Sequence, residues 1–391
     1  NDPYRYCDDS RRATDIYTTE NRAQARQLAT ESFVLLKNTL HPYTSTPLLP
    51  LSPTAKVALI GPLADTRANM AGTWSVAATF DYKTGREAFE EALPKGHFFY
   101  EKGSNIEYCQ TLQQRGELVG RSIWDERSPE QMRREAMAAA DVIVLAMGET
   151  SEMSGESASR TSLTMPKAQQ DLIDELATLH KPMVLLNFSG RPVVLTHETE
   201  VCDAILQVWF GGSETADAIT DVVFGKVSPS GKLTTSFPRS VGQEPLYYRQ
   251  FSTGRPVEDG EFVKYRSCYL DENNLPLYPF GYGLSYTTFE YSECTVQDAQ
   301  CTVKVTNTGE MAGAEVVQLY VRAQNSTLAR PVKELRGFKR VYLEPGEETT
   351  VTFDINEEAV GYYTDLQHFV VEKGLYDIYI NSTLVGTIEK N

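Results

Sequence analysis

The chain has 391 residues, of which 41% are hydrophobic and 23% are charged, a composition typical of a soluble globular protein. One hydrophobic core rarely organises so many residues, so we expect at least two domains. The 53 acidic and 37 basic residues give a formal net charge of −16, which repels phosphate backbones and anionic lipids. We therefore expect no nucleic-acid partner. Because no apolar run reaches about 18 residues, we also expect no membrane span.

The six cysteines are widely spaced along the chain, with no CxxC pair and no cysteine–histidine spacing that suits zinc. We therefore expect no structural metal, no cofactor and free thiols. Cys294 and Cys301 could still face each other across a hairpin. The cysteine pattern leaves the cellular compartment open.

The first part of the chain begins without periodicity over residues 1–18. From Thr19 onward, apolar residues at helical spacing predict a helix that ends near Lys37 and Asn38. Residues 41–54 are rich in proline, threonine and serine, which predicts a loop.

Between residues 57 and 224, short apolar runs alternate with amphipathic segments. This alternation predicts βαβ units, and so an α/β sandwich domain with a mostly parallel sheet and flanking helices on both faces. The predicted strands are 57–60, 142–145, 183–186 and 204–209, and the predicted helices are 129–140, 166–179 and 214–224.

After residue 225 the sequence pattern changes twice, first in composition and then in hydrophobic periodicity. Residues 226–288 are rich in proline, glycine and tyrosine, too aromatic for disorder, which predicts a long ordered connector. From residue 289 the apolar residues alternate with a period of two, which predicts an all-β sandwich of the immunoglobulin or fibronectin type III kind. Its predicted strands include 301–305, 315–321, 349–353 and 375–380. The predicted units are thus 1–18, 19–225, 226–288 and 289–391.

A carboxyl-rich loop with the sequence GETSEMSGESASR, residues 148–160, directly follows the apolar run 141–147, which contains the predicted strand 142–145. In open α/β sheets ligands bind beyond the carboxyl ends of the strands, so this loop is a candidate for acid/base chemistry. It contains Glu149, Glu152 and Glu156. From spacing alone, the competing interpretation is that these carboxylates are merely solvated.

Several motifs, in order along almost the whole chain, resemble the carboxyl-terminal part of glycoside hydrolase family 3 enzymes, with the periplasmic bacterial β-glucosidases as the nearest type. They are ATESFVLLKN (29–38), GPLAD (61–65), GTWS (72–75), SPSGKL (228–233), SFPR (236–239), YPFGYGLSYT (278–287), NTG (307–309) and ELRGF (334–338). The resemblance implies a three-part enzyme: a (β/α)8 barrel, an α/β sandwich and a fibronectin-like domain.

The resemblance also implies how the catalytic groups are divided. The family's nucleophile is an aspartate in a Ser-Asp-Trp-like motif on the barrel, and this sequence has neither that motif nor a barrel. Residues 1–18 are then expected to be a linker that leaves the barrel. The family's acid/base glutamate lies on a loop that resembles residues 155–160, which points to Glu156. Retaining glycosidases need two carboxyl groups about 5–5.5 Å apart, and Glu156 would be the protonated one.

Four further residues are expected to bind substrate. Trp74 would stack on a sugar ring, with a place in the core as its alternative. Asp65 could accept hydrogen bonds from hydroxyl groups or cap the following turn. Glu149 would hold either the loop or a sugar hydroxyl, and Arg160 would brace the loop by pairing with a carboxylate or lie free on the surface.

The sequence thus predicts the carboxyl-terminal portion of a retaining, exo-acting β-glycosidase of β-glucosidase type, periplasmic or secreted, inactive without its barrel. Its partners would be that barrel and a β-linked oligosaccharide or aryl glycoside. The alternative is a non-catalytic module that binds carbohydrate or acts as a scaffold. A nucleotide-binding protein is remote, because the chain has no GxGxxG and no GxxxxGK[ST] motif.

Overall fold

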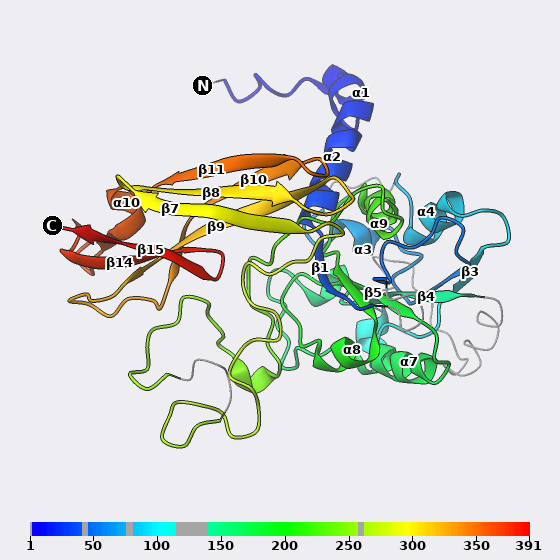
Figure 1. The fold of residues 1–391 in the computed structure, drawn as a ribbon. Coiled ribbons are helices and arrows are strands. Elements are labelled where there is room, and N and C mark those ends of the chain that lie inside the picture. Colours follow the sequence, from blue (N-terminus) through cyan, green and yellow to red (C-terminus); the bar gives the residue numbers. More distant parts are fainter. Residues whose placement is uncertain (1, 41–45, 76–80, 115–139, 257–261) are drawn as a thin grey trace.

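The computed structural model describes residues 2–40, 46–75, 81–114, 140–256 and 262–391. These residues form an α/β region built on one six-stranded sheet, an antiparallel sandwich, and a long segment that connects them (Figure 1). In the described part of the chain, no helix combines the length and the apolar character needed to span a bilayer.

The six-stranded sheet has the strand order β1-β6-β5-β4-β2-β3. Every neighbouring pair is parallel except β1 and β6, which are antiparallel at one edge. The mostly parallel α/β fold predicted from the sequence is therefore confirmed. The strands are β1 (Val34–Asn38), β2 (Val57–Ile60), β3 (Phe98–Glu101), β4 (Val142–Gly148), β5 (Met183–Phe188) and β6 (Ala204–Gln207).

Helices cover both faces of this sheet because alternate strand residues enter two separate cores. Along β4, for example, Val144 joins one core and Leu145 the other. The first core is covered by α2 (Thr19–Ser32), α4 (Gly85–Ala92) and α9 (Thr215–Val223), and the second by α7 (Lys167–Ala177) and α8 (Thr196–Val201). The short helical segments are η1 (Asp9–Arg11), α1 (Arg12–Asp15), α3 (Ala68–Ala71), η2 (Ser151–Met153), η3 (Val241–Gln243) and α10 (Glu357–Val360).

The helix predicted from Thr19 to about Asn38 is wrong in its second part. Helix α2 ends at Ser32, and Val34–Asn38 form strand β1, which pairs with β6. The physical reason is burial on two sides. Phe33 and Leu35 pack into one core while Val34 and Leu36 pack into the other. A strand between two cores satisfies that alternation, whereas a helix would bury a single stripe.

The other predicted elements of this region are confirmed wherever the structure describes them. The four predicted strands correspond to β2, β4, β5 and β6, and the two later helices to α7 and α9. Pro166 precedes α7 as its N-cap instead of occupying its first turn. The predicted helix at 129–140 lies outside the described residues, apart from its last position.

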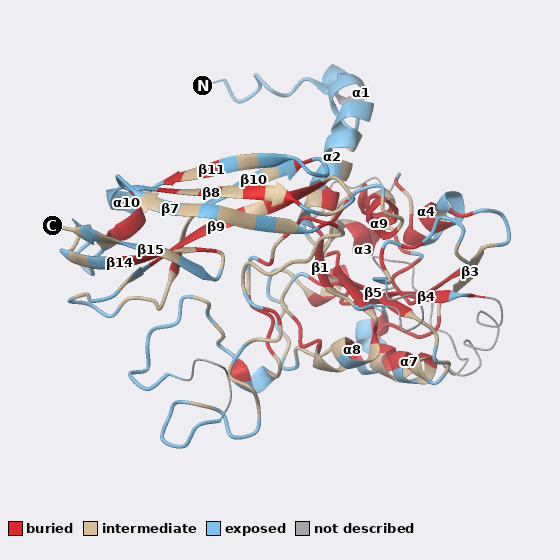
Figure 2. Ribbon diagram, in the orientation of Figure 1, coloured by how far each residue is buried: buried red, intermediate tan, exposed pale blue. Residues whose placement is uncertain are grey.

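The second region is a sandwich of two antiparallel sheets with the orders β10-β9-β14-β15 and β11-β8-β7, as the sequence predicted. Figure 2 shows buried residues along the strand interiors, where Val305, Leu319 and Ile378 contribute to a third core. The strands are β7 (Phe289–Gln297), β8 (Gln300–Asn307), β9 (Gly313–Ala323), β10 (Glu334–Leu343), β11 (Glu348–Asp354), β14 (Gly374–Ile380) and β15 (Thr383–Lys390), with a small pair formed by β12 (Tyr362–Tyr363) and β13 (Phe369–Val370).

The connecting segment makes noncovalent contacts with both the α/β region and the sandwich. The amide of Leu284 donates to the carbonyl of Leu35 at 2.9 Å, which adds a bridge beside strand β1. Lys232 forms a 3.0 Å ion pair with Glu315 of β9. The unit boundaries predicted from the sequence remain predictions. All six cysteines are free thiols.

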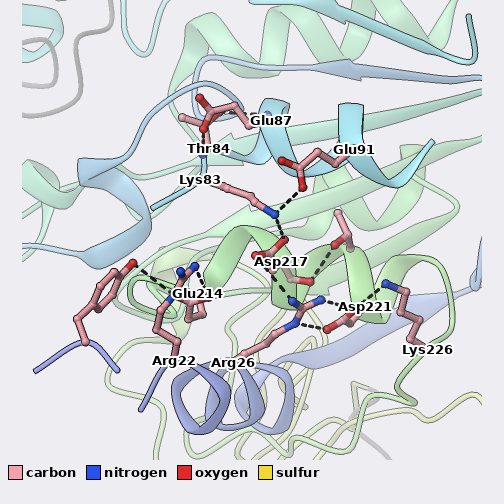
Figure 3. Close-up of polar contacts among 12 residues, drawn as sticks. Arg22, Arg26, Lys83, Thr84, Glu87, Glu91, Glu214, Asp217, Asp221 and Lys226 are labelled. Atoms are coloured by element: carbon pink, nitrogen blue, oxygen red, sulfur yellow. Dashed lines mark hydrogen bonds and ion pairs between the residues drawn. The ribbon is translucent and has the colours of Figure 1, made fainter. Parts of the chain in front are cut away.

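Helix α2 is held on α9 largely by charge, since only Ala29 and Thr30 of this helix are buried. The guanidinium of Arg26 donates two hydrogen bonds to the carboxylate of Asp221, at 2.5 and 2.7 Å (Figure 3). Arg22 binds Glu214 in the same way one turn earlier, with a shortest distance of 2.7 Å. Bidentate arginine–carboxylate pairs of this kind fix geometry as well as charge.

Replacing Arg26 with methionine is expected to lower the free energy of unfolding by about 1–2 kcal/mol, because the largely buried Asp221 carboxylate loses its bidentate donor. Urea denaturation measures the change. Lys226, which is 68% exposed and lies 3.4 Å from the same carboxylate, is the matched control. Lys226→Met should cost no more than about 0.5 kcal/mol. Equal losses for the two variants would contradict the conclusion that Arg26 is the main partner of Asp221.

A buried carboxyl on α8 predicts a dependence of stability on pH. Glu198 is fully buried, and burial raises its pKa above the ordinary value. The folded state therefore keeps this proton over a pH range in which the unfolded chain releases it, so this group lowers stability as pH rises through that range. The advantage of Glu198→Gln over the parent should grow from pH 4.5 to pH 7. Glu200→Gln, at an exposed position of the same helix, is the control. An advantage of Glu198→Gln that does not change with pH would contradict a raised pKa for Glu198.

Candidate functional site

The candidate site lies at the carboxyl ends of the adjacent parallel strands β2 and β4. After β2 the chain passes through α4 to β3 on one side of this pair, and after β4 it passes through α7 to β5 on the other side. The two connections diverge at this point, which makes it the topological switch point of the sheet. The loops that border it are residues 61–75, here the Trp74 loop, and residues 148–160, here the Glu156 loop (Figure 1).

The Glu156 loop is closely packed against its neighbours where it leaves β4. Gly148 has a φ of 128°, and a Cβ atom there would lie 2.0 Å from the carbonyl oxygen of Phe188. Only glycine fits so close an approach. The amide of Glu149 then donates to that same carbonyl at 2.7 Å, and the amide of Gly148 donates to Gln169 Oε1 at 2.8 Å.

The side chain of Glu149 is buried at the base of the loop, with 1% of its surface exposed. Its Oε1 accepts a hydrogen bond from Arg160 Nη1 at 2.8 Å, and its Oε2 lies 3.2 Å from Arg191 Nε. Arg160 thus braces the loop, one of the two roles considered for it. Glu149 holds the loop as well. A sugar contact by either residue remains a prediction.

Arg191, just beyond β5, was not identified from the sequence. It pairs with Glu149 and also donates from Nη2 to the carbonyl of Met153, in the middle of the Glu156 loop. One signal could have indicated it: an arginine placed soon after the neighbouring predicted strand 183–186. The burial of Glu149, which demands cationic partners, is not visible in the sequence.

Glu156 is exposed at the tip of its loop. The amide of Ala158 donates to the carbonyl of Gly155 at 3.3 Å, which closes a turn with Glu156 and Ser157 at its two central positions. Gly155 has a φ of 118° and Ser157 a φ of 58°, in the left-handed region that favours glycine. The turn therefore presents the Glu156 carboxyl beyond the sheet edge.

The Trp74 loop is docked onto the Glu156 loop. The hydroxyl of Thr73 lies within hydrogen-bonding distance of two carbonyls, that of Ser151 and, at 2.7 Å, that of Ser154. The buried Asn69 accepts a 2.8 Å hydrogen bond from the amide of Ser151. Trp74 itself is 70% exposed, so the alternative of a core tryptophan is wrong. An aromatic surface and a carboxyl group are thus carried by two interlocked loops.

Asp65 lies at the start of the Trp74 loop and contacts the beginning of α4. It accepts a 2.9 Å hydrogen bond from the hydroxyl of Thr84, the N-cap residue of that helix, and a 3.2 Å one from Arg86. These contacts stabilise the connection between the loop and the helix. A hydrogen bond from Asp65 to a sugar hydroxyl remains a prediction.

The chemistry that this site can supply is proton transfer. The exposed carboxyl group of Glu156 can donate or accept a proton, and the exposed indole on the docked loop can stack on a sugar ring. Across the described ranges, no group of three or more histidine, cysteine, aspartate or glutamate side chains is arranged to hold a metal ion.

Comparisons with known proteins agree with this architecture. A family model of the glycosyl hydrolase family 3 C-terminal domain matches residues 33–286, and one of a fibronectin type III-like domain matches residues 315–383. The chain is 42% identical to a periplasmic β-glucosidase of Salmonella typhimurium over 94% of its own length and 49% of the relative. It is 32% identical to a β-xylosidase of Formosa agariphila, with the same two coverages.

A solved structure shows the same fold. A mutant β-glucosidase from Listeria innocua in complex with laminaribiose superposes with a TM-score of 0.87 at 35% identity, covering 99% of this chain and 52% of that one. The chain thus spans about half the length of the curated relatives it matches. From its two matched domains and these relatives, we conclude that the chain belongs to glycosyl hydrolase family 3, as a C-terminal α/β domain followed by a fibronectin type III-like domain.

Proposed function

We propose that this chain is the carboxyl-terminal portion of a retaining, exo-acting β-glycosidase of β-glucosidase type, and that Glu156 is its general acid/base. The nucleophilic carboxylate is supplied by a barrel domain outside these 391 residues. The observation that supports this most strongly is that two docked loops at the switch point of the sheet carry exposed Glu156 and exposed Trp74.

In the proposed reaction, Glu156 acts twice. It first gives its proton to the glycosidic oxygen while the nucleophile attacks the sugar, which forms a covalent glycosyl–enzyme and releases the aglycone. It then removes a proton from the water that hydrolyses this intermediate. A proton donor serving a partner domain must be accessible, and Glu156 is exposed.

The proposed substrate is a β-linked oligosaccharide or an aryl β-glycoside, with Trp74 packed against the aglycone side. The names of the relatives support β-glucosides first and β-xylosides second. Asp65, Glu149 and Arg160 support the loops, and any contact they make with sugar is secondary. A periplasmic or secreted location is proposed from the periplasmic Salmonella relative.

The second candidate function is a non-catalytic module that binds carbohydrate or acts as a scaffold. The exposed Trp74 favours it, since an accessible indole face binds sugars without chemistry. In that case binding of cellobiose to the chain, measured by calorimetry, would be unaffected by Glu156→Gln, and joining the barrel would give no activity.

The isolated 391-residue chain is expected to show no turnover of an aryl β-glucoside, because one carboxyl cannot serve as both nucleophile and acid. The measurement is release of the chromophore, with the chain joined to its upstream barrel as the positive control. Turnover by the chain alone that disappears in Glu156→Gln would show that the division of the two carboxylates is wrong.

In the enzyme joined to its barrel, Glu156→Gln should reduce hydrolysis of cellobiose by about 10²–10⁴-fold, the usual contribution of general acid catalysis. Hydrolysis of a dinitrophenyl glucoside should fall much less at the first step, because that leaving group needs little protonation. Azide should then restore turnover by replacing the water that needs a base. Glu152→Gln, on the same loop, is the matched control and should stay within about fivefold of the parent. Equal losses on both substrates would count against Glu156 as the acid.

A further inference from the structure

We propose that Arg191 is a positioning residue for Glu156, acting as a clamp that holds the Glu156 loop at two points. This inference rests on the proposed function for its catalytic meaning. The clamp itself is a structural claim that can be tested separately in the 391-residue chain.

The clamp consists of a single guanidinium group with two loop partners. Nε of Arg191 lies 3.2 Å from Glu149 Oε2, at the start of the loop, while Nη2 donates to the carbonyl of Met153. Glu149 is almost completely buried and Arg191 is 21% exposed, so solvent screens this pair only partly. The contact with Glu149 is an ion pair without hydrogen-bond geometry, whereas the contact with Met153 is a hydrogen bond. Because the guanidinium is planar, one group links residues 149 and 153.

Thr73 supplies a second set of contacts to the loop. Thr73 contacts the carbonyls of Ser151 and Ser154, and a Cβ atom on Gly155 would lie 2.6 Å from the Thr73 methyl group. The backbone directly before Glu156 is thus bounded by Arg191 and by Thr73. Only the turn that carries Glu156 extends beyond these contacts.

Positioning matters because a general acid works within hydrogen-bond reach of the atom it protonates, about 2.6–3.2 Å. A misplacement of about 1 Å by a change remote from the reacting atoms can cost on the order of 10²-fold in rate. The ion pair and the hydrogen bond of Arg191 given above go to Glu149 and Met153, which lie before the two central turn residues. Its effect would therefore pass through the backbone of residues 149–153.

Lysine and arginine should differ at this position. A lysine ammonium can keep a positive charge beside Glu149, but it has no second nitrogen in a fixed plane to reach Met153. Arg191→Lys should therefore preserve most of the stability while loosening the loop. Arg191→Met removes the charge as well and tests the larger perturbation.

The structural test is hydrogen exchange of backbone amides in the 391-residue chain. Exchange in residues 152–158 is expected to rise about tenfold in Arg191→Lys and more in Arg191→Met, because the loop opens locally. Thr73→Val, close in shape to the parent residue, should also speed exchange there. Arg26→Met, which removes a comparable guanidinium from the α2–α9 contact, is the control for general destabilisation. Its loop exchange should match the parent.

The catalytic test uses the enzyme joined to its barrel. Arg191→Lys should lower kcat for cellobiose about 10–100-fold and change KM by less than about threefold. With a dinitrophenyl glucoside the loss should be no more than about threefold when azide is present, because this leaving group needs little protonation and azide replaces the water that needs a base. A merely structural role would lower both activities equally.

The outcomes separate the two proposals. Loop exchange in Arg191→Lys that equals the parent, or that rises equally in Arg26→Met, would overturn the clamp whatever Glu156 does. Faster loop exchange with equal losses on both substrates, measured with azide present, would overturn the positioning role while leaving the structural clamp. If Glu156→Gln itself shows no dependence on the leaving group, the proposed function fails, and the exchange result still stands as a test of the clamp.

Discussion

The burial of one carboxylate, that of Glu149, is the constraint on which the geometry of the site depends. A charge with 1% of its side chain exposed must be compensated, because removing it from water costs several kcal/mol. Its partners, Arg160 and Arg191, come from the far end of the same loop and from the neighbouring strand's loop. Pairing this charge therefore draws three stretches of chain together at the base of the Glu156 loop.

The parallel sheet places both loops where their side chains are accessible. The β2 and β4 connections diverge at the switch point, so the two loops there are free to extend beyond the sheet edge. Thr73 joins them, and their exposed members, Trp74 and Glu156, lie just past the joined backbone. The sheet, the buried ion pairs and the docked loops thus form a rigid support for two accessible groups. The proposed function requires this division, because there the loop serves a second domain.

Much of the fold could be predicted because its signals are local. Apolar runs bounded by turns predicted β2, β4, β5 and β6, and alternation predicted the sandwich. Strand β1 was missed because its apolar run also continues the helical face of α2. This segment forms a strand because it is buried between two cores, which is a tertiary effect. Glu156 and Trp74 could be named from motifs. The roles of Arg191 and Thr73 could not, because their contacts join loops far apart in sequence.

A crystal structure of the chain joined to its upstream barrel, with a glycone-mimicking inhibitor bound, would test the account most directly. The quantity to measure is the distance between the carboxyl group of Glu156 and that of the barrel nucleophile. The account predicts about 5–5.5 Å, the separation that retaining glycosidases require. A nucleophile whose nearest carboxyl partner is another residue, with Glu156 more than about 9.5 Å away, would contradict it.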